Sequence, residues 1–342
     1  MYRCARERPR LLWSLLLLSL MTATGVDAAE KIDLIIDADP GVDDMVALLF
    51  ALASTQELNI RALTTVAGNV RLHKTSRNAR LAREWAGREE VPVYAGASTP
   101  LLRKPIYAED IHGKEGVSGI TVHEPEKGLA EGNAVEYLVN TLTAARPHSI
   151  TIAMLGPQTN LALALVQEPN IVQGIKEVVV MGGAHFNGGN ITPLAEFNLF
   201  ADPQAAEVVL NSGVPLTYLP LDVTHKMLTS DARVQKIAAL NNNASRQVVD
   251  MLNDYIKADM ERYGIAGGPV HDATVIAYLL KPQLFSGRAV NVVVDCGEGP
   301  TLGQTVVDWY DDLKAPKNVF WVEGGDAQGF FDLLTERLAR LK

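Results

Sequence analysis

The sequence predicts an α/β fold, a single large domain with a mostly parallel, doubly wound sheet flanked by helices. Short apolar runs rich in β-branched residues alternate with longer runs of helical periodicity from Lys31 onward. No repeat or low-complexity segment interrupts this alternation. The 342 residues are 47% hydrophobic and 21% charged, as in a globular protein with one large core. Such an alternation is typical of a parallel sheet with helices on both faces.

The strands are predicted where β-branched and other apolar residues run together between turn residues. In chain order they cover residues 32–36, 60–66, 150–155, 178–181, 216–219 and 290–295. The first four of these runs end in clusters of Asp, Gly or Asn, which are typical of the turn that follows a strand.

The helices are predicted where apolar residues recur three and four positions apart. In chain order they cover residues 43–53, 72–85, 160–167, 203–211, 273–280 and 326–341. Two long stretches, 94–132 and 182–198, are rich in Gly, Pro and polar residues and are predicted to be loops. Long ordered loops on such a scaffold usually build the functional site.

Charge and targeting signals narrow the class of protein. The formal charge of −9 argues against a nucleic acid polymer as a partner, because such a partner requires clustered basic surface. Residues 1–28 read as a signal peptide with four arginines, an apolar run at 11–21 and a small-x-small cleavage site ending at Ala28. The apolar run is shorter than the ~20 residues that span a bilayer, so no stable membrane anchor is expected. The remaining domain, 29–342, is expected to be periplasmic or extracellular.

Polar clusters directly follow the predicted strands. They are Asp37-Ala38-Asp39-Pro40-Gly41-Val42-Asp43-Asp44, Ala67-Gly68-Asn69, Gly156-Pro157-Gln158-Thr159-Asn160 and Gly182-Gly183-Ala184-His185. In open α/β sheets ligands bind beyond the carboxyl ends of the strands. We therefore expect these clusters to gather at one edge of the sheet and to form the site.

The four aspartates between residues 37 and 44 favour a metal site. Buried carboxylates this close together need protons or a cation to offset their repulsion. Oxygen ligands suit Ca²⁺ or Mg²⁺, and the lack of clustered Cys and His argues against zinc. The alternative, that Asp43 and Asp44 simply open a helix, leaves Asp37 and Asp39 unexplained.

Two further polar groups lie downstream. His271 and Asp272 open the helix predicted at 273–280, and alone they would favour an ordinary helix start. Asn190, Glu196 and Asn198 lie in the second long loop, where they would either stabilise the loop or contribute to the site. If residues 196–198 are extended, the side chains of Glu196 and Asn198 point to one side.

Taken together, these motifs closely resemble the inosine-uridine preferring nucleoside hydrolases, enzymes that cut the N-glycosidic bond of ribonucleosides. The resemblance rests on the aspartate motif 37–44, on Ala67-Gly68-Asn69, Ala195-Glu196-Phe197-Asn198 and His271-Asp272, and on Gly303-Gln304-Thr305-Val306-Val307-Asp308. It covers essentially the whole chain after the leader and implies the nucleoside hydrolase fold and a role in nucleoside catabolism or purine salvage. It also implies a homodimer or homotetramer acting on small ribonucleosides, purine, pyrimidine or both.

The resemblance also implies roles for individual residues. A Ca²⁺ ion would be bound by Asp39, Asp44, Asp272 and the main-chain carbonyl of Leu155, with Asp37 supporting the metal loop. Ribose hydroxyls would be bound by Asp43, Asn69, Asn190, Glu196 and Asn198, and His112 would face the substrate from a loop that closes. Tyr255 and Tyr263 would either cover the base or pack in the core.

The expected chemistry follows from the bond that breaks. Departure of the base leaves an oxocarbenium-like ribose, which surrounding carboxylates stabilise. Asp39 would take the proton of a Ca²⁺-bound water, and His271, with a pKa near neutrality, would protonate the leaving base.

Two other functions fit part of the sequence. A phosphohydrolase of the haloacid dehalogenase type also places Asp-x-Asp after its first strand, with Asp37 as the nucleophile. However, Pro40 and Gly41 replace the hydroxyl-bearing continuation of that motif. An exported nucleoside- or sugar-binding protein fits the leader and the Asn and Asp residues, but it would need neither a dense metal site nor an acid at His271.

Overall fold

A nine-stranded sheet in the order β3-β2-β1-β4-β5-β6-β9-β7-β8 organises the molecule. The computed structural model describes residues 1–2, 30–264 and 267–342, apart from the side chains of 258, 259, 262 and 263. The strands are β1 Ile32–Ala38, β2 Leu58–Thr65, β3 Val93–Ala95, β4 Ile150–Met154, β5 Ile175–Met181, β6 Leu216–Leu219, β7 Phe285–Val294, β8 Thr305–Asp308 and β9 Val319–Gly325. Neighbouring strands are parallel except at one edge, where β7 is antiparallel to both β9 and β8. The prediction of a mostly parallel α/β sheet is confirmed.

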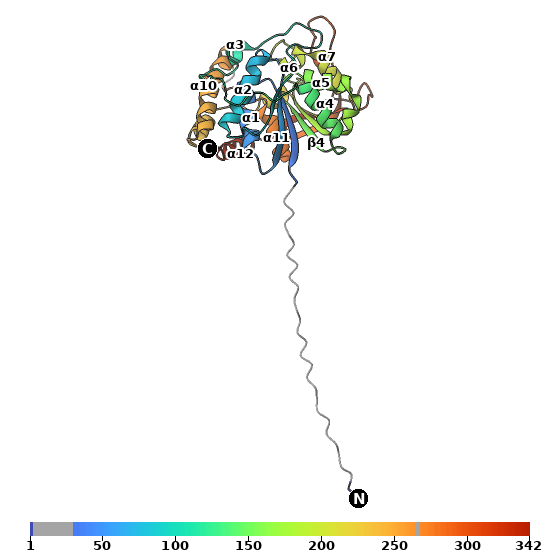
Figure 1. Ribbon diagram of the computed structural model, residues 1–342. Coiled ribbons are helices and arrows are strands. Elements are labelled where there is room, and N and C mark those ends of the chain that lie inside the picture. Colours follow the sequence, from blue (N-terminus) through green and yellow to red (C-terminus); the bar gives the residue numbers. More distant parts are fainter. Residues whose placement is uncertain (3–29, 265–266) are drawn as a thin grey trace. The chain divides into compact units, whose positions relative to one another are not determined.

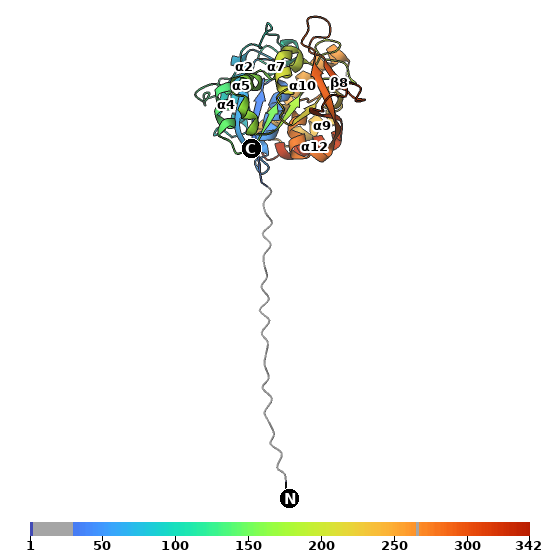
Figure 2. The same ribbon diagram turned by 90° about the vertical axis from the view of Figure 1, so that its right-hand side faces the viewer.

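Helices cover both faces of this sheet. They are α1 Val42–Ala53, α2 Leu72–Trp85, α3 Glu109–His112, α4 Ala134–Ala144, α5 Thr159–Gln167, α6 Phe197–Ala201, α7 Pro203–Leu210, α8 Leu221–Thr224, α9 Asp231–Ala238, α10 Asn243–Tyr263, α11 Ala273–Leu280 and α12 Ala327–Leu338, with 3₁₀ turns at Pro169–Gln173 and Pro282–Leu284. Helices α4, α5 and α7 lie on one face, and α1, α10, α11 and α12 lie on the other (Figures 1 and 2). None of the helices in the described ranges is long and apolar enough to cross a membrane.

The central strand β1 is buried on both sides. Its Leu34 and Ile36 pack in the core beneath α1 and α11, whereas Ile35 packs in the core beneath α4, α5 and α7. Successive side chains of a strand point to opposite faces, so a strand between two helical layers must be apolar at every position. At the carboxyl end of β1, the apolar residues give way to Asp37 and then to Asp39.

The strand order places a crevice next to β1. The chain moves from β1 to β2 and β3 on one side, and from β4 to β5 and β6 on the other. Connections that leave in opposite directions create a gap between the carboxyl ends of β1 and β4, where open α/β sheets bind ligands. Asp39 follows β1 at this gap and Leu155 follows β4.

The predicted elements agree with the structure in part, since the sequence analysis gave no bounds for α4, α9, α10, β3, β8 or β9. Helices α2 and α11 and strand β6 have the predicted bounds. The loop predicted at 94–132 is wrong in part, because it contains the end of β3 and the one-turn helix α3. Both elements are too short for periodicity to reveal. The predicted signal peptide lies outside the described residues, apart from Met1 and Tyr2.

Candidate functional site

A cavity opens at the carboxyl ends of the central strands, and most of the predicted site residues line it. Those that line it are Asp43, Asn69, His112, Leu155, Asn190, Glu196, Asn198, Tyr255, His271 and Asp272. Asp37, Asp39 and Asp44 are buried and do not line it. The side chain of Tyr263 lies outside the described residues. Segments far apart in the sequence therefore meet as the strand-end motifs predicted.

The carboxylate of Asp39 is held in a narrow slot. Its Oδ2 accepts the backbone N–H of Asn69 at 2.7 Å, and its Oδ1 is buried without a hydrogen-bond partner among the described residues. Two glycines border this carboxylate. A Cβ at Gly68 would lie 2.0 Å from Oδ2, and one at Gly156 would lie 2.2 Å from Oδ1. The glycines in two of the polar motifs thus leave the space that the carboxylate occupies.

Asp44 closes the turn that carries Asp39. Helix α1 begins at Val42, and Asp44 in its first turn accepts the N–H of Gly41 at 2.9 Å and of Asp39 at 3.2 Å. The side-chain amide of Asn69 donates to Asp44 Oδ2 at 3.0 Å and to the carbonyl of Asp39 at 3.1 Å. Both oxygens of Asp44 therefore have donors, and the turn is fixed by its own residues.

Three buried aspartates form an acidic cluster beside this turn. Carboxylate oxygens of Asp43, Asp44 and Asp272 lie within 4.8 Å of one another. Burial raises the pKa of Asp44, and burial together with repulsion from neighbouring aspartates raises the pKa of Asp39 and Asp272 well above the usual range. A divalent cation would offset this repulsion, and an all-oxygen donor set fits a hard cation. Asp43, expected at the ribose, belongs to this cluster, whereas Asp39 is linked to it through its backbone N–H, which donates to Asp44.

The carbonyl of Leu155 lies at the end of β4. It accepts the side-chain amide of Asn198 at 2.7 Å, and the N–H of Leu155 donates to the carbonyl of Asp37 at 2.8 Å. A carbonyl oxygen has two lone pairs, so this hydrogen bond leaves one for a metal.

Asp37 supports the site from within the sheet. Its Oδ2 accepts the Thr64 hydroxyl at 2.5 Å and the Asn160 amide at 2.8 Å, while its Oδ1 has no partner in the part of the chain that the structure describes. Burial raises the pKa of Asp37 to about 7. Asn160 also donates to the carbonyl of Thr65, so Asp37 joins β1, β2 and the start of α5 below the cavity.

The loop after β5 contributes three polar residues. Glu196 is the N-cap of α6, and its carboxylate accepts the N–H groups of Asn198, Leu199 and Gly183 at 2.8 to 3.2 Å. Burial raises the pKa of Glu196 to about 7. Asn190 Oδ1 accepts the N–H of Phe197 at 2.9 Å. The extended conformation considered for 196–198 is wrong, because α6 begins at Phe197.

His112 and Tyr255 line another part of the cavity. His112, at the end of α3, accepts the N–H of Val42 on Nδ1 at 3.1 Å, so the neutral ring carries its proton on Nε2. Burial lowers the pKa of His112 to about 4. The rings of His112 and Tyr255 stack with centroids 5.5 Å apart. Tyr255 is 3% exposed, so it both packs in the core and borders the cavity.

His271 contacts Thr224 and His225, the residues at the end of α8. Its Nδ1 lies 2.7 Å from the hydroxyl of Thr224, and its ring centroid is 5.5 Å from that of His225. Burial, with further contributions from His225 and His112, lowers the pKa of His271 well below its usual value. Burial therefore opposes the pKa near neutrality that was expected of His271 from the sequence.

Sequence reasoning missed Thr224 and His225. Both follow β6 through the short helix α8, and His225 lines the cavity. Position was the available signal, because polar residues after a central strand were the criterion used for the other motifs.

Comparisons with known proteins agree with this arrangement. The family model described as inosine-uridine preferring nucleoside hydrolase matches residues 34–332. A Schizosaccharomyces pombe protein described as uncharacterized is 43% identical over 90% of this chain and 99% of its own. The pyrimidine-specific ribonucleoside hydrolase RihA of Salmonella typhimurium is 42% identical over 89% of this chain and 97% of its own.

Solved structures resemble the fold equally well. A purine-preferring ribonucleoside hydrolase from Gardnerella vaginalis superposes with a TM-score of 0.84 and 30% identity, covering 90% of this chain and 98% of its own. The plant nucleoside hydrolase PpNRh1 has the same TM-score and identity, covering 91% of this chain and 99% of its own.

Proposed function

The chain belongs to the inosine-uridine preferring nucleoside hydrolase family, and we propose how its residues carry out that family's reaction. It is an N-glycosidase of nucleoside catabolism, which hydrolyses the N-glycosidic bond of ribonucleosides to free base and ribose. This membership decides against the phosphohydrolase and the binding protein that the sequence alone left open.

The observation that carries the proposed mechanism is that Asp39 Oδ1, near the acidic cluster, has no hydrogen-bond partner in the described part of the chain. A buried carboxylate oxygen without a donor is costly unless a cation or a proton meets it. Asp39, Asp44, Asp272 and the carbonyl of Leu155 would hold Ca²⁺, which suits an all-oxygen site. When bound, calcium would supply positive charge that anchors ribose hydroxyls and lowers the pKa of the attacking water.

Asp39 is the proposed general base. The N–H of Asn69 fixes Oδ2, which leaves Oδ1 to accept the proton of water as it attacks the anomeric carbon. The leaving base takes the bonding electron pair, so positive charge builds on the ribose and the nearby carboxylate of Asp43 stabilises it. Asn69, Asn190, Glu196 and Asn198 are proposed to orient the ribose, because all four border the same cavity.

His271 is the proposed acid for the leaving base. Burial keeps its ring neutral before substrate binds. Negative charge that develops on the departing base favours protonation of a nearby imidazole, so the reaction itself opposes the effect of burial. The contact with Thr224 holds the ring in one orientation.

Pyrimidine ribonucleosides are the proposed preferred substrates. The support is the name of the Salmonella relatives, which are described as pyrimidine-specific and are 41–42% identical. A purine preference remains the second candidate, since the Gardnerella enzyme with the same fold is described as purine-preferring. We also propose a homodimer or homotetramer that is exported after cleavage near Ala28.

Ribose release from uridine, cytidine, inosine, adenosine and guanosine tests this proposal. We expect release from at least one of them, with the highest kcat/KM on a pyrimidine. The purified enzyme should retain roughly one calcium per chain and lose activity and thermal stability on exhaustive chelation. Full activity in a calcium-free preparation would contradict the metal assignment.

Two variants separate the proposed base from the proposed acid. Asp39→Ala should fail both on nucleosides and on p-nitrophenyl riboside, whose leaving group needs no proton. His271→Ala should lose at least about 10²-fold in kcat on the preferred nucleoside, at the lower end for general acid catalysis, and cleave p-nitrophenyl riboside nearly normally. Equal losses of His271→Ala on the two substrates would rule out its acid role.

A further inference from the structure

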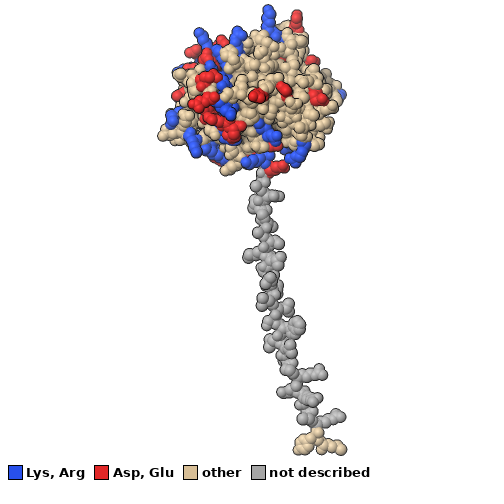
Figure 3. Space-filling view, in the orientation of Figure 1, with Lys and Arg blue, Asp and Glu red and all other residues tan. Residues whose placement is uncertain are grey.

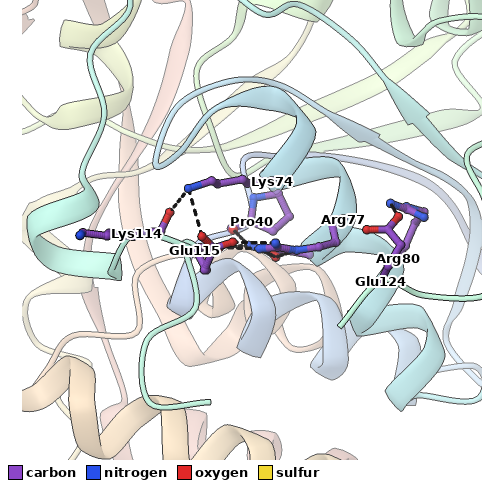
Figure 4. A network of polar contacts seen from close by, with 8 residues as sticks. Pro40, Lys74, Arg77, Arg80, Lys114, Glu115 and Glu124 are labelled. Atoms are coloured by element: carbon purple, nitrogen blue, oxygen red, sulfur yellow. Dashed lines mark hydrogen bonds and ion pairs between the residues drawn. The ribbon is translucent and has the colours of Figure 1, made fainter. Parts of the chain in front are cut away.

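Basic side chains of α2 bind the segment that follows His112 through ion pairs and hydrogen bonds. Lys74, Arg77, Arg80 and Arg83 recur every third residue of α2, so each is a neighbour of the next on the helix surface and the row winds around the helix. They bind individual residues of the segment 114–128, and Figure 4 shows the contacts of Lys74, Arg77 and Arg80 with Lys114, Glu115 and Glu124. Figure 3 shows acidic and basic side chains mixed together on the part of the surface that carries α2. The row of basic side chains therefore holds in place a long connecting segment that has little secondary structure of its own.

Glu115 is the anchor nearest the site. Its carboxylate pairs with Arg77 at 2.6 Å and with Lys74 at 3.3 Å, and its carbonyl accepts Arg77 Nη2 at 3.0 Å. Farther along, Arg80 pairs with Glu124, and Arg83 donates to the carbonyl of Gly128 at 2.8 Å. The side chain of Glu115 is 45% exposed, so salt can screen its two ion pairs.

Asn78 connects this anchor to the aspartate turn. The side chain is fully buried, and its Nδ2 donates to the carbonyl of Pro40 at 3.0 Å and to that of Glu115 at 2.9 Å. Gly116 has a φ of +80°, and a Cβ there would lie 2.9 Å from Asn78 Nδ2 and 3.2 Å from the Pro40 carbonyl. The segment therefore packs directly against the residue that follows Asp39.

The same segment is bound to His112. The N–H of Ser118 donates to the carbonyl of His112 at 3.0 Å, and His112 in turn accepts the N–H of Val42. His112 borders the cavity. If Glu115 moved away from α2, the short turn between residues 112 and 118 would therefore displace His112 as well.

We infer that Asn78 and Glu115 are positioning residues that hold His112 in the wall of the cavity. The ion pairs of Glu115 then set the fraction of molecules in which His112 occupies this position. The inference rests on the proposed function, since a wall of the nucleoside cavity is what they position. When only a fraction of molecules has the binding-competent wall, apparent substrate affinity falls by that fraction. The acidic cluster does not contact the Glu115 carboxylate, so turnover of bound substrate should change little.

The test compares Glu115→Gln with Glu124→Gln. Both remove one carboxylate that pairs with α2 from the same segment, but only Glu115 is joined to Pro40 through Asn78. At low salt we expect Glu115→Gln to raise KM for the preferred nucleoside about two- to tenfold, with kcat within twofold of wild type. Glu124→Gln should keep the wild-type KM.

Ionic strength and a second variant complete the test. Salt should raise the wild-type KM towards the Glu115→Gln value and leave the KM of Glu115→Gln nearly constant. Asn78→Asp turns the donor towards two carbonyls into an acceptor and should raise KM further, provided that it folds. Equal KM values for the two glutamine variants in an active enzyme would overturn this inference alone, whereas a wild type that releases no ribose would overturn the proposed function as well.

Discussion

Each oxygen of the Asp39 carboxylate faces a glycine, and this determines what the site tolerates. The aspartate motif is visible in the sequence because charge repulsion makes four clustered acids unusual. The reason for Gly68 and Gly156 is not visible there, because the Cβ they lack would collide with the side chain of Asp39, which comes from another segment of the chain. Likewise, Asp37 is recognisable as part of the motif, but its partners Thr64 and Asn160 are known only once β2 and α5 are placed.

Gly156→Ala should inactivate the enzyme without unfolding it. The added Cβ would lie 2.2 Å from Asp39 Oδ1 and would push the carboxylate out of its slot, whereas the φ of Gly156 is one that alanine accepts. We expect kcat to fall about 10²-fold or more, the usual contribution of a general base. A steady-state assay of ribose release measures this loss, and thermal denaturation checks that the fold is retained.

Gly128→Ala is the matched control, because a Cβ at Gly128 meets nothing within 4 Å. It should retain wild-type turnover. If Gly156→Ala were as active as Gly128→Ala, the position of the Asp39 carboxylate would not matter for the reaction.

At the scale of elements, sequence patterning predicted the bounds of α2 and α11, but it gave no bounds for the longer helices α4 and α10 and none for the one-turn helices. The bounds of α2 follow from its apolar spacing alone, whereas α3, α6 and α8 are each four or five residues long. Their conformations depend on contacts made elsewhere, such as the backbone N–H groups that Glu196 caps. Of the site residues on these short helices, His112 was named only through the family resemblance, Asn198 was a candidate from the sequence itself, and Thr224 was missed.

The N-cap of α6 gives a pH-dependent contribution to stability. The pKa of Glu196 is about 7 in the folded protein, against 4.5 for an exposed glutamate, so the folded state retains its proton over that interval. This stabilisation is fully present below about pH 4.5 and is lost as the pH rises to about 7, an effect of up to about 3 kcal/mol.

Glu196→Gln should remove this dependence. Melting temperatures measured between pH 5 and pH 7 should fall more steeply for the wild type than for the variant. The difference in slope isolates Glu196, since the acidic cluster is common to both proteins. Parallel slopes would show that Glu196 does not change protonation between the folded and unfolded states in this range.

At the scale of the molecule, the sequence predicts a parallel sheet but not the order of its strands. Alternating strands and helices predict a parallel sheet, and the gap between β1 and β4 then places a site beside Asp39. The antiparallel edge formed by β7 and β8 could not be predicted, because the direction of a strand is set by its neighbours and not by its composition.

Export should remove the leader without touching the sheet. The first strand begins at Ile32, so cleavage near Ala28 leaves only three exposed or undescribed residues ahead of the central strand. N-terminal sequencing of the protein recovered outside the cytoplasm should find a start near Ala29. Retention of Met1 in membrane-bound material would instead indicate an anchor.

The pairing of β1 with β4 also bears on when the enzyme becomes active. Asp33 pairs with Ile150, so the two sides of the catalytic crevice come from segments made more than a hundred residues apart. Parallel contacts of such long range close large chain loops and slow folding. A newly made chain therefore stays unfolded longer than one with local contacts, which would suit the export proposed for this protein.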